Sequence, residues 1–167
     1  MSESTKAANA VVIERAFNAP VDLIWRLWTD AEEYPKWYGP NGFTVTVVEM
    51  DVRVGGRRLL YMMPPDKNMK IWTTGEYKEI MPNARLDYTD CPADEAGNVQ
   101  SLAAMGMGDD TSPMITEVTV LLEAVDGRTK MVLTHAGIPA DSPGASGWEQ
   151  ALDKMVAYAE RSLVPDA

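Results

Sequence analysis

The alternation of hydrophobic and polar residues divides most of the chain into strands, and helical spacing appears in only two regions. Short β-branched and aromatic runs separated by turn residues are typical of an antiparallel meander. The predicted strands are residues 11–17, 43–48, 57–63, 70–80, 84–90, 114–124 and 129–135. Gly55-Gly56 and Asp126-Gly127 favour hairpin turns, because the central residues of such turns need positive φ.

Two short helices are predicted between the first and second strands. Pro20 suits a first helical turn, and a capping-box pattern at residues 29–32 begins the second helix. The apolar face of the first helix consists of Val21, Ile24, Trp25 and Trp28. The second helix carries three aromatic residues: Tyr34, Trp37 and Tyr38.

A long amphipathic helix is predicted at the C-terminal end. Residues 146–149 form a second capping-box pattern, and Pro165 ends the helix. Its apolar stripe consists of Trp148, Leu152, Met155, Val156, Ala159 and Leu163. This order of elements predicts an α+β helix-grip fold, in which a curved antiparallel sheet of about seven strands wraps around one long C-terminal helix.

The predicted sheet is much wider than the helix, which implies a space between them. Seven strands span about 33 Å, whereas a helix of about 18 residues is about 27 Å long and about 10 Å across. Either large side chains or a bound molecule must fill the rest, and the chain offers 11 Met, 5 Trp and 6 Tyr. Packing as ordinary core is the alternative for each lining candidate. These candidates for binding a ligand are Trp28, Trp37, Tyr38, Leu60, Met62, Trp72, Tyr77, Tyr88, Met114, Thr116, Met131, His135, Trp148, Leu152 and Met155.

Length, charge and cysteine content narrow the functional classes. The 167 residues fit one domain, which we place at residues 11–164 after a disordered tail at residues 1–10. A net charge of −10 disfavours nucleic acid and anionic membranes as partners, because both attract a cationic surface. No apolar run reaches the ~20 residues of a membrane helix, and no secretion signal is evident. The single cysteine, Cys91, precludes an internal disulfide and favours a reducing compartment, so we expect a cytoplasmic protein.

Catalytic machinery is sparse in the sequence. The only histidine, His135, shares its strand face with Met131 and Leu133, so it is predicted to point inward. There it can act as a general base, orient a ligand or be a satisfied structural residue, and the last two roles are favoured. One histidine and one cysteine do not suffice for a usual zinc site, and no phosphate-binding or dinucleotide-binding loop is present. We expect no cofactor and no metal, and a non-enzymatic role is preferred over an enzymatic one.

Six segments in a fixed order carry a resemblance to a known superfamily. They are ERAFNAPVDLIWRLWTD at 14–30, KWYGP at 36–40, DVRVGGR at 51–57, GEYKEIMPNARLDYT at 75–89, TxxxLTHxG at 129–137 and GWEQALDKM at 147–155. Together they resemble the START-like superfamily, also called the polyketide-cyclase or birch-pollen-allergen-like (SRPBCC) superfamily. Within it, the pattern is similar to homologues of the activator of the heat-shock-protein-90 ATPase (AHSA-like). The resemblance implies a deep cavity between sheet and C-terminal helix, and members of the superfamily bind lipids, polyketides or plant hormones or act as cyclases and hydrolases.

Three functions follow, in order of preference. The first is binding of a small hydrophobic molecule in an internal cavity, the second is a chaperone-interaction module, and the third is a cyclase- or hydrolase-type enzyme that uses the cavity. A small apolar ligand is the expected partner, and a protein partner or a homodimer stays open. A long insertion at residues 92–113 departs from the family pattern. Loops of this length are either functional or disordered, so we interpret it as a mobile flap near the cavity mouth or as a disordered decoration.

Overall fold

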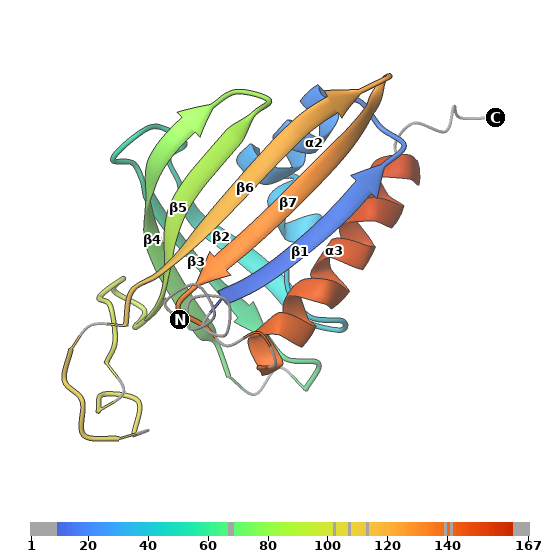
Figure 1. Ribbon diagram of the computed structural model, residues 1–167. Coiled ribbons are helices and arrows are strands. Elements are labelled where there is room, and N and C mark those ends of the chain that lie inside the picture. Colours follow the sequence, from blue (N-terminus) through green and yellow to red (C-terminus); the bar gives the residue numbers. More distant parts are fainter. Residues whose placement is uncertain are drawn as a thin grey trace.

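The computed structural model describes residues 10–66, 69–101, 103–106, 108–112, 114–138, 140 and 142–161. Seven strands form one antiparallel sheet in the order β1-β7-β6-β5-β4-β3-β2 (Figure 1). The strands are β1 (Ala10–Phe17), β2 (Thr44–Met50), β3 (Arg57–Met63), β4 (Ile71–Met81), β5 (Arg85–Ala93), β6 (Thr116–Val125) and β7 (Arg128–Ala136). Strands β2 to β7 follow one another as a meander, and β1 forms the edge of the sheet beside β7.

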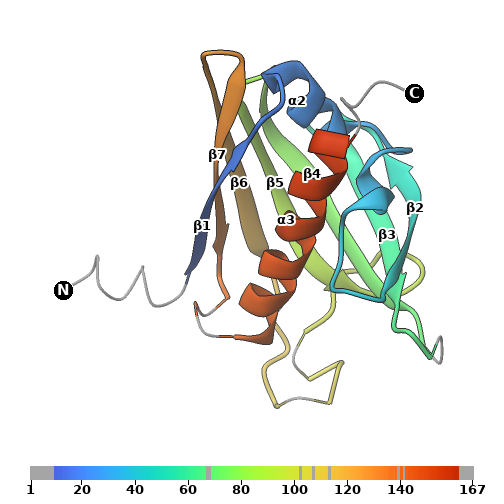
Figure 2. The same ribbon diagram turned by 90° about the vertical axis from the view of Figure 1, so that its right-hand side faces the viewer.

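Three helical segments pack on one face of the sheet: α2 (Val21–Thr29), η1 (Tyr34–Lys36) and α3 (Pro143–Arg161). Figure 2 shows α3 crossing the curved sheet, with α2 at one end of it. α3 has 19 residues and is therefore about 28 Å long, close to the predicted length. The predicted α+β helix-grip architecture is confirmed.

The second predicted helix is wrong in kind, because only one 3₁₀ turn forms there. Pro35 lies in the first turn of this 3₁₀ segment, where no backbone N–H is needed. In the predicted α-helix, which begins several residues earlier, Pro35 would lie beyond the first turn, where its missing N–H would break a hydrogen bond. Asp30 organises the chain instead: its Oδ1 accepts the backbone N–H of Glu32 at 2.8 Å, and its carbonyl accepts those of Glu33 and Tyr34. This turn nevertheless delivers Tyr34, and next to it Trp37, into the core.

The long helix begins three residues before its predicted capping box. Ser142 caps it, since its side-chain oxygen accepts the backbone N–H of Ala145 at 3.3 Å. The predicted helix-ending residues Leu163 and Pro165, and the predicted tail apart from Ala10, lie outside the described residues. At the β6–β7 hairpin, the expected two-residue turn is present, with φ of 53° at Asp126 and 78° at Gly127.

One lining candidate lies on the wrong face of the sheet. Trp72 pairs with Tyr61, and the two rings are in contact in a tilted arrangement with a centroid distance of 4.8 Å. Tyr61 follows Leu60, which is fully buried in the core, so alternation places Tyr61 and Trp72 on the outer face. Trp72 and Tyr77 are five residues apart and would share a face only if a bulge lay between them. The bulge of β4 falls after Tyr77, so the expected inward direction of Trp72 is wrong.

Candidate functional site

A cleft of about 250 Å³ opens where the first turns of α3 meet the ends of β3, β5 and β7 and the loop after η1. Most of its walls are apolar or lack a side chain, and Tyr38, Asp90 and His135 supply the ionisable groups. The lining residues are Tyr38, Gly39, Pro40, Met62, Asp90, His135, Ile138, Gly144, Gly147, Trp148 and Ala151. Its volume lies just below the roughly 300–1,000 Å³ of typical small-molecule pockets, so it suits a small guest.

Aromatic side chains fill the middle of the space between sheet and helix. Trp28, from α2, lies 4.7 Å from Trp37 and 6.1 Å from Trp148 between ring centroids. Tyr34 stacks on Tyr38 at 4.6 Å. The indole Nε1–H of Trp37 donates to the carbonyl of Leu27 at 2.8 Å, which fixes the ring. These rings therefore occupy the middle of the space in which a cavity was expected, and the cleft lies at the end near the N-terminus of α3.

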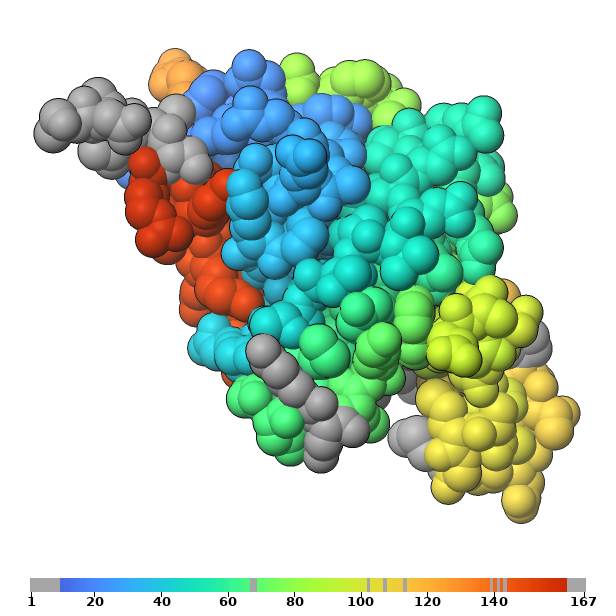
Figure 3. Space-filling model, turned by 180° about the vertical axis from the view of Figure 1, so that it is seen from behind, coloured from blue at the N-terminus to red at the C-terminus, as the bar shows by residue number. Residues whose placement is uncertain are grey.

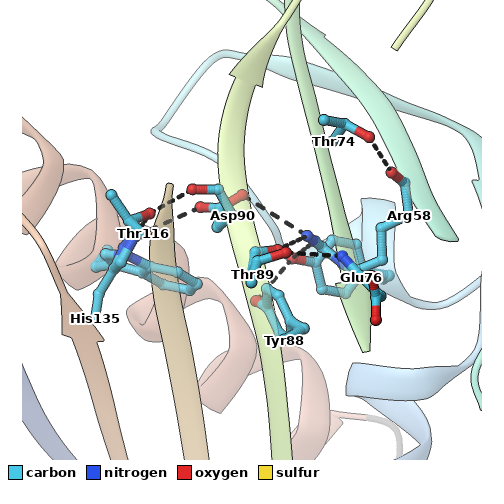
Figure 4. Close-up of polar contacts among 10 residues, drawn as sticks. Arg58, Thr74, Glu76, Tyr88, Thr89, Asp90, Thr116 and His135 are labelled. Carbon is cyan, nitrogen blue, oxygen red and sulfur yellow. Dashed lines mark hydrogen bonds and ion pairs between the residues drawn. The ribbon is translucent and has the colours of Figure 1, made fainter. Parts of the chain in front are cut away.

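His135 is held on both ring nitrogens. The indole Nε1–H of Trp148 donates to Nδ1 at 2.8 Å. Since indole can only donate, the neutral imidazole carries its proton on Nε2, which lies 2.7 Å from the hydroxyl oxygen of Thr116. The Thr116 hydroxyl donates in turn to the backbone carbonyl of Asp90 (Figure 4). Every proton in this chain has an acceptor, so α3, β7, β6 and β5 are tied together beside the cleft.

The surroundings of His135 keep it neutral. Burial lowers the pKa of His135 below its ordinary value, although the Asp90 carboxyl group 3.8 Å away acts in the opposite direction. The alternation of β7 correctly predicted that this side chain points inward. Both nitrogens already have partners, so His135 offers no free lone pair for a general base, and the geometry favours a structural histidine.

A buried ion pair lies next to this chain. Arg58 is only 1% exposed, and its guanidinium group sits 3.9 Å from the ring centroid of Tyr88 and 3.7 Å from Oδ1 of Asp90. Its Nη2 donates to the hydroxyl of Tyr34 at 3.1 Å, and its Nη1 donates to the carbonyl of Thr89 (Figure 4). Burial raises the pKa values of Tyr34 and Tyr88 well above their ordinary value, so both phenols are neutral at pH 7.

The predicted lining residues lie in four different environments in the structure. Four of them line the cleft: Tyr38, Met62, His135 and Trp148. Nine are buried elsewhere between sheet and helices, and these are Trp28, Trp37, Leu60, Tyr77, Tyr88, Thr116, Met131, Leu152 and Met155. Trp72 lies on the outer face, and half-buried Met114 precedes β6, where its backbone N–H donates to Gln100.

The sequence analysis did not predict several other residues that line the cleft. Gly144, Gly147 and Ala151 present little or no side chain at the start of α3, so an apolar-stripe search passes over them. Small residues at helical spacing that face a wide sheet were the available signal. Asp90 was also missed, since a carboxylate near a strand end is more often found in solvent.

The insertion contacts the outer face of the sheet. The guanidinium of Arg57 donates to the carbonyl of Ala96 at 3.0 Å, and Val99 bridges Ala93. Gly97 and Val99 border a groove over Cys91 on that face. Figure 3 shows the insertion, in yellow, standing out from the body of the molecule. None of its described residues lines the cleft, so they do not form the expected flap over it.

The described residues contain no group of three His, Cys, Asp or Glu side chains that could hold a metal ion. Among them, no helix is both long enough and apolar enough to cross a membrane. These two findings apply to the described part of the chain.

Comparisons with known proteins place the chain in a family. A search of curated proteins finds no match. A protein from Chromobacterium violaceum, solved by X-ray crystallography, is 27% identical, with a TM-score of 0.75 over 95% of this chain and 99% of the other. The AHSA1 protein from Silicibacter pomeroyi is 17% identical and shares the fold, with a TM-score of 0.70 over 92% of this chain and 99% of the other. Residues 18–160 match the family described as "Activator of Hsp90 ATPase homolog 1-like protein", and the chain belongs to that family.

Proposed function

We propose that this member of the activator of Hsp90 ATPase homolog 1-like family binds a small, mainly apolar molecule in the cleft at the N-terminal end of α3. The observation that carries the proposal is the cleft itself, with apolar walls and a few polar groups at defined places. Binding sites for small molecules combine these two properties, because apolar walls supply affinity and isolated polar groups fix orientation.

The shape of the helix supports this location. Gly144, Gly147 and Ala151 lie on the side of α3 that faces the cleft, so no long side chain of the helix fills the gap beside Pro40 and Met62 at these positions. A Cβ atom on Gly147 would lie 3.4 Å from the ring of Pro40. A larger side chain at this position would therefore occupy the cleft.

The test follows the methyl group of Met62 by NMR with ¹³C-methyl-labelled methionine. The probe is 2-methoxynaphthalene, a small neutral apolar compound. We expect a saturable shift of the Met62 signal in the wild type. Gly147→Leu should abolish the shift because leucine fills the cleft, and it should not unfold the helix, since leucine is a better helix former than glycine by roughly 0.6–1 kcal/mol.

Ala157→Leu is the matched control. Ala157 is exposed on the same helix and does not line the cleft, so this variant adds similar bulk without blocking the site. It should bind as the wild type does. If the wild-type Met62 signal fails to shift with saturation, or if Gly147→Leu binds as well as Ala157→Leu, the cleft is not the binding site.

The family description keeps a chaperone-interaction module as a second candidate. In that case the protein would stimulate the ATPase of an Hsp90 chaperone, and stimulation would persist in Gly147→Leu because it does not need the cleft. The cytoplasm, where Cys91 would stay reduced, is the location we propose for either function.

A further inference from the structure

The carboxyl group of Asp90 lines the cleft without a hydrogen bond to satisfy it. Its side chain is 12% exposed. Oδ1 is fully enclosed on the side of Arg58 and has no hydrogen-bond partner, so Oδ2, beside His135, is the oxygen that is open to the cleft. Among the described residues, its charged neighbours stay beyond hydrogen-bonding distance, with Arg58 Nη1 at 3.7 Å from Oδ1 and His135 Nε2 at 3.8 Å from Oδ2 (Figure 4). A buried carboxylate without donors is costly, so this group will favour whatever donor enters the cleft.

The neighbouring donors are committed elsewhere and cannot move in. The guanidinium of Arg58 is clamped by the hydroxyl of Tyr34, the carbonyl of Thr89 and the ring of Tyr88. The Nε2–H of His135 faces the Thr116 hydroxyl at 2.7 Å. The hydroxyl of Tyr38, which also lines the cleft, forms no hydrogen bond with Asp90 among the described contacts. Solvent is then the donor that reaches Oδ2, and a ligand that expels this solvent must replace its hydrogen bond or leave Oδ2 unsatisfied.

We infer that the cleft selects neutral apolar molecules that carry a hydroxyl group, which donates a hydrogen bond to Asp90. The inference rests on the proposed function and adds the chemical class of the ligand. A neutral donor fits because Arg58 already balances the charge of Asp90. An ammonium group would add an unbalanced positive charge to a partly dry site, and an anionic ligand would face the carboxylate directly.

The test compares 2-naphthol with its methyl ether, 2-methoxynaphthalene, by calorimetry on the wild-type protein. The ether is the more apolar compound, so a purely apolar cleft would prefer it by about fourfold for one extra methyl group. A hydrogen bond to a charged acceptor favours the naphthol by roughly 10- to 150-fold. The net expectation is that 2-naphthol binds roughly 3- to 40-fold more tightly.

A cationic compound separates neutral from charged donors. We expect 2-naphthylmethylamine, which is protonated at pH 7, to bind more weakly than 2-naphthol. If the amine binds more tightly, the site recognises cations and the inference is overturned. If the naphthol and the ether bind equally, or if the ether binds better, the inference fails while the proposed function stands. If none of the three compounds binds, the proposed function fails with it.

A double variant assigns the preference to Asp90. Asp90→Val alone would leave Arg58 as a buried unpaired charge and destabilise the protein, so it is combined with Arg58→Met, which removes both members of the pair. Valine suits a strand and cannot accept a hydrogen bond. In this variant we expect the ether to bind about as well as the naphthol or better. A naphthol preference equal to that of the wild type would show that Asp90 is not the acceptor. If the variant does not fold, the three-compound comparison on the wild type still decides.

Discussion

Trp148→Phe should destabilise the protein by more than the loss of side-chain volume explains. The substitution keeps an aromatic ring in place and removes the only group that donates to Nδ1 of His135 among the described residues. Trp148 is 6% exposed, and its ring contacts Trp28, Tyr38 and His135 at centroid distances of 5.6–6.1 Å. The change therefore removes both packing and one buried hydrogen bond.

The two contributions can be estimated separately. The smaller ring loses about three buried heavy atoms, which amounts to roughly 2 kcal/mol of apolar burial. Leaving the Nδ1 acceptor of His135 without a donor adds about 1–3 kcal/mol. The total of roughly 3–5 kcal/mol is a large part of the 5–15 kcal/mol that stabilises an ordinary domain, so the variant should be folded but clearly weakened.

A double-mutant cycle isolates the hydrogen bond. Urea unfolding is followed by circular dichroism, because the substitution changes the fluorescence itself. In a His135→Leu background the acceptor is gone, so the cost of Trp148→Phe should fall to about 2 kcal/mol or less. Equal costs in both backgrounds would refute the reasoning. Imidazole ¹⁵N NMR of the wild type gives an independent check: a protonated Nδ1 in the neutral ring would contradict the assigned tautomer.

Three further predictions concern pH, a turn and the insertion. Burial lowers the pKa of His135, so the unfolded chain takes up a proton before the folded protein does, and the free energy of unfolding should fall as pH drops below about 6.5, by up to ~1.4 kcal/mol per pH unit. His135 is the only histidine, so urea unfolding between pH 7.5 and 5.5 should lack this component in His135→Gln. Gly56→Ala should cost about 1–3 kcal/mol in the same assay, because its Cβ would lie 1.9 Å from the carbonyl oxygen of Asp51, and a neutral effect would contradict that close approach. Replacing residues 95–110 with a short linker should leave the affinity for 2-methoxynaphthalene unchanged, since the described contacts of the insertion lie on the outer face; weaker binding would restore the flap hypothesis.

The strands were predictable because several signals in the sequence agreed. Residues 57–63 were predicted and observed with the same bounds, and the other six strands differ by one to three residues at their ends. Alternation, β-branched residues and turn residues favour the same pairing, and Asp126-Gly127 adopts the positive φ that its hairpin requires. In the predicted turn at Gly55-Gly56, only Gly55 has positive φ. The direction of His135 followed from the same alternation, because no bulge interrupts the register of β7 with β1 or β6.

The prediction of side-chain direction was wrong in β4, where it depended on the position of a bulge. A strand of 11 residues such as β4 can carry inward residues of both parities if a bulge lies between them. Nothing in the sequence says whether the bulge precedes or follows Tyr77, and counting Trp72 as inward assumed that it precedes. A single slip of this kind reverses one part of a strand and leaves the fold unchanged.

The location of the cleft could not be predicted from the sequence, for a different reason. The width of the sheet correctly indicated that one helix cannot cover it, but not which side chains fill the gap. Trp28 comes from α2, and Tyr34 and Trp37 come from the turn after it. Trp28 contacts both of these rings and also Trp148 of α3. Contacts between elements so far apart along the chain depend on the tertiary arrangement, which periodicity within each element does not contain.

The proposed ligand binding and the stability of the protein both depend on Trp148. It lines the cleft, packs on the central aromatic rings and donates to His135, so a molecule bound in the cleft as proposed would contact the residue that connects α3 to β7. A ligand that binds the folded protein and not the unfolded chain stabilises it, by about 2.7 kcal/mol at a hundredfold excess over its dissociation constant. In Trp148→Phe the cleft keeps its other walls but loses part of this wall and the tie behind it. A ligand should therefore recover less stability in that variant than in the wild type, because its affinity for the loosened cleft is lower.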